Sequence, residues 1–274
     1  MPIKQEGNKR KVSCTELFPP HLSSLHTEVE STYLFLEHAV QEDPSLACGA
    51  FIDTISQKAG RGQRGNSWYA SPGKNIHPSF TVAGTGLSAI NGWRIAEWVA
   101  CALCTLVEEL IAAQKEHHTV YIKWPNDIYI GKKKVAGILI SHTLAGDLIS
   151  HSLVGIGLNI NEEVFPSSLP NPVSIRRITA MQYDLAAIRT RLKELLASYF
   201  PLILDKGSFA ELHDHYIQHL YLYHRWHTFR IPSSNQCFRG CIEGVTPEGK
   251  LQIRDPHGDA HLFMFKEIEF DETT

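Results

Sequence analysis

The chain has 274 residues, of which 43% are hydrophobic and 20% are charged, a balance typical of a globular protein with a sizeable core. Its formal net charge of -3 argues against a general nucleic-acid binder and against a protein that lies on a membrane surface. No apolar run reaches the ~18 residues of a membrane-spanning helix. The polar start MPIKQEGNKRKVSC does not have the apolar core of a secretory signal, so we expect a cytoplasmic location.

Secondary-structure signals follow one another along the whole chain. The first 22 residues are polar and end at two prolines, and we expect a loose arm there. The strongest helix is expected over 91–113, where apolar residues recur at helical spacing. Before it we expect a strand (25–30), a helix (31–41) that Ser31 could cap, and two strands (48–55 and 79–84) on either side of a loop (57–76). After it we expect three strand candidates (120–124 with 127–130, 134–143 and 147–160), a proline-broken loop (165–172) and two helices (184–200 and 208–220).

The order of these elements indicates the fold class. Strands dominate the middle of the chain without regular alternation with helices, which favours an α+β fold with a mainly antiparallel sheet over a doubly wound fold. Several short strands separated by turns at Pro247-Glu248-Gly249 and His257-Gly258-Asp259 predict a small C-terminal β-barrel. We therefore divide the chain into an N-terminal arm (1–22), a main domain (23–225) and a barrel (226–274).

Cysteine and histidine residues form two groups that could bind a metal. A zinc site from Cys101 and Cys104 with Cys237 and Cys241 is disfavoured, because the first pair lies in an apolar helix without flanking knuckle residues. We interpret all six cysteines as reduced, mostly buried thiols. The histidines between 213 and 227 match no known metal cage, and we interpret them as a polar helix face and a loop.

The segment GRGQRGNSWYASPGKN (60–75) combines glycines with positive charge. Its glycines let the backbone approach a ligand closely. Five basic residues and no acidic residue occur between Thr54 and Ala96, although the chain is net negative. A flexible cationic loop suits a polyphosphate, and Trp68 could cover a base. The alternative is an ordinary solvated loop.

Three further motifs carry polar groups at strand ends. KWPND (123–127) presents Asn126 and Asp127 in a turn, and a carboxylate there suits a magnesium ion that travels with phosphates. In GKKKVAGILI (131–140), Lys134 opens an apolar strand and Gly137 leaves room beside it. The two glycines of GIGLNIN (155–161) predict close approach by a ligand or by another backbone.

In this order and spacing, GRGQRGNSW, KWPND, KVAGIL and GIGLNIN resemble the signature set of biotin–protein ligases. The resemblance covers roughly residues 25–270, with weaker matches at Glu30-Ser31-Thr32 and at FRGCIEGVTPEGKLQI. It implies the catalytic domain shared with class II aminoacyl-tRNA synthetases, followed by an SH3-like barrel. It also implies formation of biotinyl-5'-AMP from biotin and ATP with Mg²⁺, and transfer of biotin to a lysine of a biotin carboxyl carrier protein.

The resemblance also implies site residues. Around biotin it places Ser31, Thr32, Gln57, Gly60, Arg61, Lys134, Gly137, Gly155 and Gly157. Around ATP and the adenylate it places Arg61, Arg64, Trp68, Asn126, Lys134 and Asn159. The implied catalytic residues are Arg61, Lys134, Lys123 and Asp127, and Asp127 is also the implied magnesium ligand.

This chain departs from the family pattern at three places. Tyr33 stands where asparagine is common, and Gln63 and Asn66 stand where arginine is common. The glycine-rich loop therefore has fewer charges with which to hold an adenylate. Phe265-Lys266-Glu267 replaces a more usual Gly-Gly-Glu, which affects the expected contact between the barrel and the main domain.

Three alternative functions remain open. A ligase of the same fold could act on lipoate or octanoate, although the Gly-Arg-Gly loop and KWPND favour biotin. A biotin-sensing repressor would need an N-terminal DNA-binding domain of about 60 residues, and about 24 precede the first expected strand, so we expect no DNA binding. A catalytically inactive binding protein is disfavoured by Arg61, Lys123, Asp127 and Lys134. Family members often form a homodimer through the central sheet.

Overall fold

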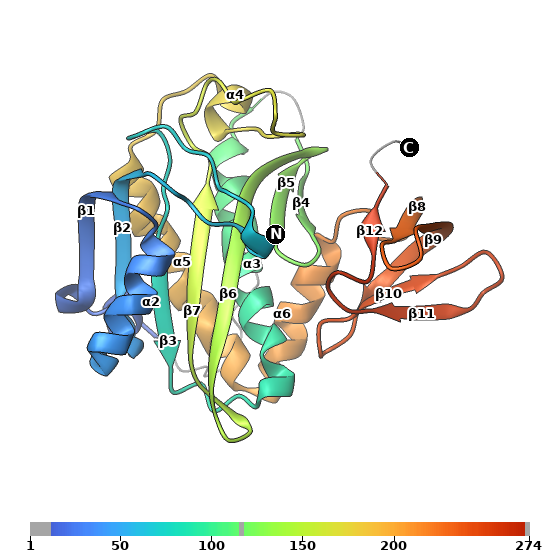
Figure 1. Cartoon of the computed structure of the whole chain (residues 1–274), viewed down its shortest axis with the longest axis horizontal. Coiled ribbons are helices and arrows are strands. Elements are labelled where there is room, and N and C mark those ends of the chain that lie inside the picture. The colour runs from blue at the N-terminus through green and yellow to red at the C-terminus, as the bar shows by residue number, and fades with distance from the viewer. Residues whose placement is uncertain (1–11, 115–117, 272–274) are drawn as a thin grey trace.

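The computed structural model describes residues 12–114 and 118–271. Within them, a large mixed sheet forms the centre of the molecule (Figure 1). Only β1 and β2 in this sheet run parallel, and every other neighbouring pair is antiparallel, which confirms the expected α+β class. In spatial order its strands are β1 (Ser23–Val29), β2 (Phe51–Gln57), β3 (Ser79–Ala83), β7 (Leu148–Leu158), β6 (Lys133–Ala145), β5 (Asp127–Ile130) and β4 (Val120–Lys123).

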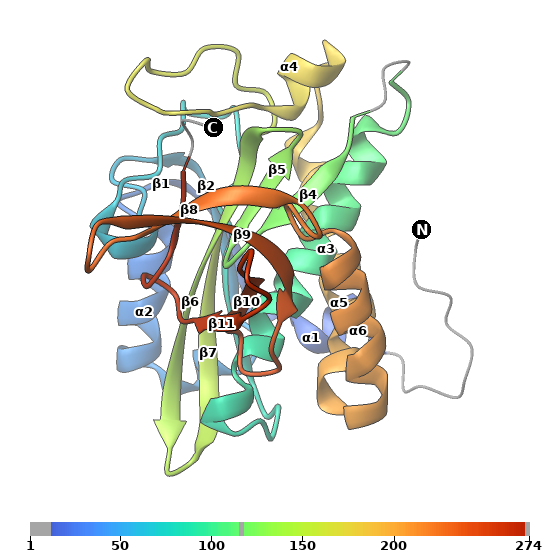
Figure 2. The same ribbon diagram turned by 90° about the vertical axis from the view of Figure 1, so that its right-hand side faces the viewer.

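Helices cover both faces of this sheet. On one face lie α3 (Trp93–Ile111), α5 (Leu185–Leu204) and α6 (Lys206–Gln218), and α2 (Thr32–Glu42) lies on the other (Figures 1 and 2). Most apolar side chains of α3 are buried against α5 and the sheet, and Trp98 Nε1 donates a hydrogen bond to the Leu196 carbonyl at 2.8 Å. The short helix α4 (Ile175–Thr179) follows the proline-broken loop. The site described below lies on the α2 face.

The expectation of a loose arm is wrong for residues 12–22. A short helix, α1 (Cys14–Leu17), begins at a capping box formed by Ser13 and Glu16, and a 3₁₀ turn, η1 (Pro20–Leu22), follows. Phe18 is 2% exposed, and its ring packs edge-on against Phe51 and Phe80, with ring centroids 5.2 Å apart in both pairs. The residues around Phe18 are mostly polar, so the composition of this stretch did not indicate a buried ring.

A second antiparallel sheet follows at the C-terminus, as expected. Its described strands are β8 (Trp226–Ile231), β9 (Gln236–Val245), β10 (Leu251–Arg254), β11 (Ala260–Phe263) and β12 (Glu269–Phe270), in the order β11-β10-β9-β8-β12. The sheet contacts the main domain despite the unusual Phe265-Lys266-Glu267 segment. Trp124 Nε1 donates a hydrogen bond to the Gly249 carbonyl at 3.0 Å, and the Phe265 ring lies edge-on to Trp124.

The cysteines and histidines match the prediction only in part. All six cysteines are free thiols, as expected, but Cys48 and Cys237 are exposed rather than buried. The interpretation of the histidines as a polar face is wrong for His215, which is 5% exposed and faces the interior.

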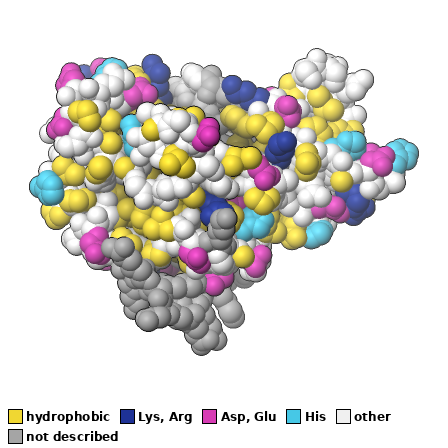
Figure 3. Space-filling view, turned by 90° about the horizontal axis from the view of Figure 1, so that it is seen from below, with side chains coloured by type: hydrophobic (Ala, Val, Ile, Leu, Met, Phe, Trp, Pro, Cys, Tyr) yellow, Lys and Arg dark blue, Asp and Glu magenta, His cyan; other side chains and the backbone are white. Residues whose placement is uncertain are grey.

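Acidic and basic side chains of the described residues are interspersed over the face in Figure 3. No helix in the described part of the chain combines the length and apolarity needed to cross a membrane.

Candidate ligand-binding site

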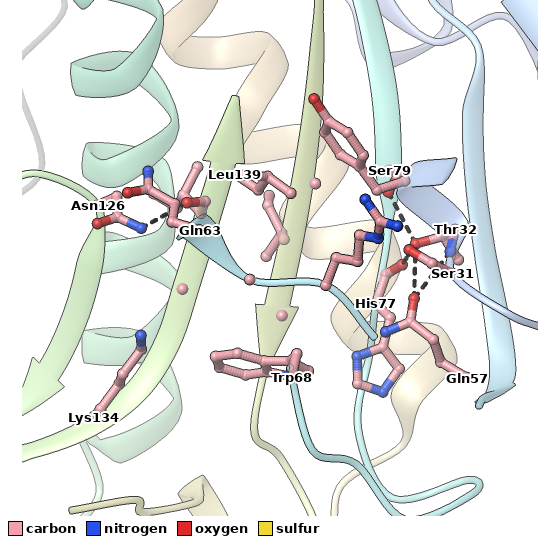
Figure 4. A pocket seen from close by; sticks show the side chains of 18 residues that line it. Ser31, Thr32, Gln57, Gln63, Trp68, His77, Ser79, Asn126, Lys134 and Leu139 are labelled. Carbon is pink, nitrogen blue, oxygen red and sulfur yellow. Dashed lines mark hydrogen bonds between the residues drawn. The ribbon is translucent and has the colours of Figure 1, made fainter. Parts of the chain in front are cut away.

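A cavity lies between the N-terminus of α2, the 60–75 loop and strands β6 and β7 (Figure 4). The structure brings together most of the residues that the sequence motifs predicted. Uncharged polar side chains gather at one end, Lys134 and Asn126 lie at the other, and Trp68 lies between them. The predicted residues that line it are Ser31, Thr32, Gln57, Arg61, Trp68, Asn126, Lys134, Gly137, Gly155 and Gly157.

The glycines of β6 and β7 make room for aromatic rings. Gly137 and Gly157 are paired across the two strands, and the Trp68 indole packs on both. A Cβ atom at Gly157 would lie 2.3 Å from Trp68 Cε2, so no larger residue fits beside the indole as it stands. A Cβ atom at Gly155 would lie 2.9 Å from Tyr33 Cδ2. The predicted close approach is therefore made by two protein side chains in this structure.

Gly60 has a different role from the one predicted. It does not line the cavity, but a Cβ atom there would lie 2.5 Å from both Gln57 Nε2 and the Trp68 carbonyl oxygen. The absence of a side chain at Gly60 therefore lets Gln57 and the loop backbone pack together. Gly60 shapes the cavity wall from behind.

Hydrogen bonds hold the uncharged polar end in place. Gln57 Oε1 accepts a hydrogen bond from the Thr32 amide at 2.9 Å, and Thr32 Oγ1 donates to the His77 carbonyl at 2.7 Å. Ser31 occupies the N-cap position of α2, as expected, yet its side chain makes no capping hydrogen bond. Its Oγ is buried without a partner among the described residues.

His77 was not predicted as a site residue. It lines the cavity, is 3% exposed, and its Nδ1 has no hydrogen-bond partner in the described structure. Burial, assisted by Arg189, lowers the pKa of His77 to about 4, so the ring is neutral at neutral pH. A buried polar group without a partner costs about 1–3 kcal/mol, so Ser31 Oγ and His77 Nδ1 together point to a polar, uncharged ligand group. His77 belongs to no motif, and its sequence position gave no signal.

A buried ion pair behind the cavity positions His77. Asp53 on β2 is 1% exposed, and its Oδ1 accepts hydrogen bonds from the amides of Thr54 and His77, both at 2.8 Å. Arg189 on α5 donates to the other carboxylate oxygen. Burial raises the pKa of Asp53, and these hydrogen bonds oppose that rise. Asp53 therefore connects α5 to the cavity wall.

The opposite end of the cavity is cationic. Lys134 Nζ lies 2.7 Å from Asp127 Oδ1 and 5.5 Å from the centroid of the Trp68 ring. Asn126 Nδ2 donates to the Ile138 carbonyl at 2.8 Å, which fixes its side chain. Arg61 also lines the cavity, with an exposed side chain. The side chain of Arg64, also predicted here, lies outside the described part of the structure.

A second cavity shares two lining residues with the first. Trp68 and Lys134 border both, and Asn159, another predicted residue, borders the second. Aromatic, aliphatic, amide and proline side chains complete its lining, namely Tyr69, Phe165, Leu169, Asn66, Asn171, Pro170 and Pro172, together with Ser67. The arrangement suits a flat, polar ring system beside an anionic linker.

The side chains at two of the departures from the family pattern also face the first cavity. Gln63 borders it, and its Oε1 is buried without a partner among the described residues. Tyr33 OH donates to Ser141 Oγ at 2.7 Å, and its ring covers Gly155. Both residues therefore shape the space that a ligand would occupy.

Lys123 does not lie in the first cavity. Its Nζ is 4.9 Å from the Tyr129 ring centroid and 5.0 Å from that of Phe270, and it lines a separate cavity with Tyr221 and Asp271. The aromatic rings around its ammonium group stabilise the charge locally. Its predicted catalytic role therefore has no geometric support in this structure.

Comparison with known proteins agrees with this geometry. Residues 29–159 match the biotin/lipoate A/B protein ligase family. The chain is 28% identical over 227 residues to the biotin–[acetyl-CoA-carboxylase] ligase of Paracoccus denitrificans, a match that covers 80% of this chain and 90% of that protein. It is 33% identical over 139 residues to the bifunctional ligase/repressor BirA of Escherichia coli, but this match covers 48% of the chain and 38% of BirA.

Solved structures show the same fold. The biotin protein ligase from Aquifex aeolicus in complex with biotin and ATP superposes with a TM-score of 0.73 at 20% identity, covering 91% of this chain and 98% of that one. The Leishmania major biotin protein ligase in complex with biotinyl-5-AMP has a TM-score of 0.57, also at 20% identity, covering 88% and 98%. The fold is thus that of the biotin protein ligases. The match of residues 29–159 to the biotin/lipoate A/B protein ligase family, together with the Paracoccus relative, places the chain among the ligases.

Proposed function

We propose that this protein is an ATP-dependent biotin–protein ligase. It forms biotinyl-5'-AMP from biotin and ATP, then transfers the biotin to a specific lysine of a biotin carboxyl carrier domain. The observation that carries the proposal is one cavity with a neutral polar end and a cationic end, which adjoins a second cavity across Trp68 and Lys134. The names of the relatives from Paracoccus and Aquifex support the same activity.

The neutral polar end matches the chemistry of biotin's ureido ring. That ring is uncharged and offers one carbonyl acceptor and two N–H donors. Ser31 Oγ and His77 Nδ1, both buried and without partners in the described structure, would hydrogen-bond to it. A lipoyl dithiolane or an octanoyl chain has no such groups and would leave both unpaired, which is the reason for preferring biotin over these substrates.

The cationic end matches the first chemical step. An oxygen of the biotin carboxylate attacks the α-phosphorus of ATP, and the bond between the α-phosphorus and the bridging oxygen breaks to release pyrophosphate. Lys134 and Arg61 would offset the repulsion between the two anions and stabilise charge in the transition state. Magnesium would accompany the triphosphate and neutralise part of its charge. Asp127 offers the hard oxygen ligand that would hold it.

The second cavity would hold the adenosine, with Trp68 and Asn159 beside it. In the second step the neutral amine of the acceptor lysine attacks the acyl carbon of the mixed anhydride, and AMP leaves with the bonding electrons. The amine has an ordinary pKa of about 10.4, so docking must be coupled to loss of its proton. A loop that closes over the anhydride would protect it from water.

Exchange of labelled pyrophosphate into ATP tests the proposal, with biotin, lipoate and octanoate assayed in parallel. We expect exchange that depends on biotin and is absent with the other two acids. Exchange with lipoate or octanoate but not biotin would assign the chain to the other branch of the family. Failure of all three to support exchange would reject adenylate formation.

A further inference from the structure

A cluster of metal-binding side chains lies between α3 and α6, on the face of the sheet away from the cavity. The two helices lie side by side (Figure 2). Cys104 and Glu108 are one turn apart on α3, so both face the same side, and His219 follows the last residue of α6. One donor atom from each of these three residues lies within 4.8 Å of the other two. None of the three lines the cavity described above.

The hydrogen bonds of His219 orient its ring for cation binding. Its Nδ1 lies 2.8 Å from the His215 carbonyl oxygen, which can only accept, so Nδ1 carries the hydrogen. Its Nε2 lies 3.1 Å from Glu108 Oε1. A lone pair on Nε2 would face a carboxylate at that distance, so a proton or a metal ion must lie between them. Metal-bound histidines usually have this same arrangement, with the remote nitrogen donating to a backbone carbonyl.

His215 adds an independent observation. It is 5% exposed, its Nε2 has no hydrogen-bond partner in the described structure, and its ring centroid lies 4.5 Å from that of His219. The cluster therefore joins a Cys-x3-Glu pair on one helix to a His-x3-His pair that begins on the other. Cysteine, histidine and glutamate side chains all bind zinc, and a structural zinc ion usually has four ligands.

We propose that Cys104, Glu108 and His219 bind a zinc ion, with His215 Nε2 or a water molecule as the fourth ligand. Zinc ligands at about 2.0–2.3 Å from the metal lie roughly 3.3–3.8 Å from one another. His219 Nε2 and Glu108 Oε1 already lie 3.1 Å apart, so the change needed is an approach of up to about 1 Å toward Cys104 Sγ, and Glu108, whose side chain is 38% exposed, is free to adjust. The Cys104 thiol loses its proton to solvent as the Zn–S bond forms, with no change of oxidation state.

The position of the cluster indicates a structural role. The His219 carbonyl accepts a hydrogen bond from the Ile122 amide at 2.7 Å, which connects the end of α6 to β4. A metal ion bound here would join α3, α6 and the segment that leads into the C-terminal sheet. With His215 Nε2 as the fourth ligand, the site would be closed by protein ligands, unlike a catalytic zinc site with an open position.

Metal titration of the full-length protein, after removal of metals with a chelator, tests this proposal. We expect one equivalent of Zn²⁺ to bind and to raise the melting temperature, and Co²⁺ to give a thiolate-to-metal charge-transfer band. Cys104→Ser should remove that band, and Cys104→Ser and His219→Gln should each weaken zinc affinity at least about 100-fold, since even outer-shell changes cost 10–100-fold. Glu108→Gln, at a partly exposed position, provides a ligand variant that retains the fold.

Cys101→Ser is the matched control. Cys101 lies one turn earlier on α3 and is equally buried, but its Sγ donates to the Leu212 carbonyl at 3.7 Å and is outside the cluster. The zinc affinity of the Cys101→Ser variant should match that of the unmodified protein. Absence of stoichiometric zinc binding would overturn the proposal and leave a protonated His219 paired with Glu108. Binding that persists in folded Cys104→Ser and His219→Gln variants would also overturn it.

Discussion

Lys134 lies next to Asp127 and Trp68 and borders both cavities. We expect Lys134→Ala to lower biotin-dependent pyrophosphate exchange about 10²–10³-fold, because it removes a charge that is needed mainly in the transition state. Its partly exposed ion pair is worth only ~0–1 kcal/mol, so the melting temperature should change little. Exposed Lys133→Ala is the matched control and should retain exchange. Near-normal exchange in Lys134→Ala would exclude Lys134 from the mechanism.

Gln63 stands where the family resemblance leads us to expect arginine. The residue borders the cavity and does not point only to solvent. A charged hydrogen bond contributes roughly 1.5–3 kcal/mol, against 0.5–1.5 for a neutral one. We therefore expect Gln63→Arg to slow the release of biotinyl-AMP about 5-fold or more, measured by stopped-flow dissociation of the pre-formed adenylate. Equal rates, or faster release from the arginine variant, would contradict this prediction.

At the scale of secondary-structure elements, α1 and the residue after it contribute more than the sequence indicated. Phe18 packs between Phe51 and Phe80 in the main core. We expect Phe18→Ala to lower the free energy of unfolding by about 3–5 kcal/mol, because it leaves a cavity in a packed core. Urea unfolding measures this change, and exposed His21→Ala should be near neutral. If Phe18→Ala left the free energy of unfolding nearly unchanged, the expectation of a loose arm would stand.

The 60–75 loop is anchored at its C-terminal half. The Ser71 amide and Oγ both donate to Glu162 at 3.0 Å, and Asn75 Nδ2 donates to it at 3.1 Å. We expect the part around Arg61 to become ordered when biotinyl-AMP binds, because ligand contacts then offset the loss of loop entropy. Trypsin cleavage after Arg61 should slow with ligand present. Identical cleavage with and without ligand would argue against closure of the loop.

Sequence reasoning located most elements, and physical limits explain what it missed. Helical periodicity identified α3 because one long element buries many apolar side chains. The parallel pairing of β1 with β2 depends on a long-range register that local patterns do not encode. The glycine motifs predicted close approach at Gly155 and Gly157, but only the structure shows that Tyr33 and Trp68 make it. His77 was missed because its role depends on burial. The motif did not indicate that Lys123 lines a separate cavity, because motif membership does not specify the direction of a side chain.

At the scale of the whole molecule, buried neutral histidines make stability depend on pH. Burial lowers the pKa of both His77 and His215 to about 4, below the ordinary value of 6.5. Between these values the unfolded chain binds more protons than the folded one, so stability falls as pH drops from about 6.5 to 4. We expect His77→Gln to show a shallower decline than the unmodified protein in urea unfolding at pH 7 and pH 5. If the free energy of unfolding fell equally in both proteins between pH 7 and pH 5, His77 would not contribute to the pH dependence.

Trp68 separates the two cavities as a common wall that is one side chain thick. Any ligand that shifts or clamps the indole in one cavity thereby changes the shape of the other. The two occupants are then thermodynamically coupled, and the factor by which the first alters the affinity of the second equals the factor in the reverse direction. Coupling between two ligands bound in these cavities would require no conformational change elsewhere in the protein, because a single ring that packs on Gly137 and Gly157 would transmit it.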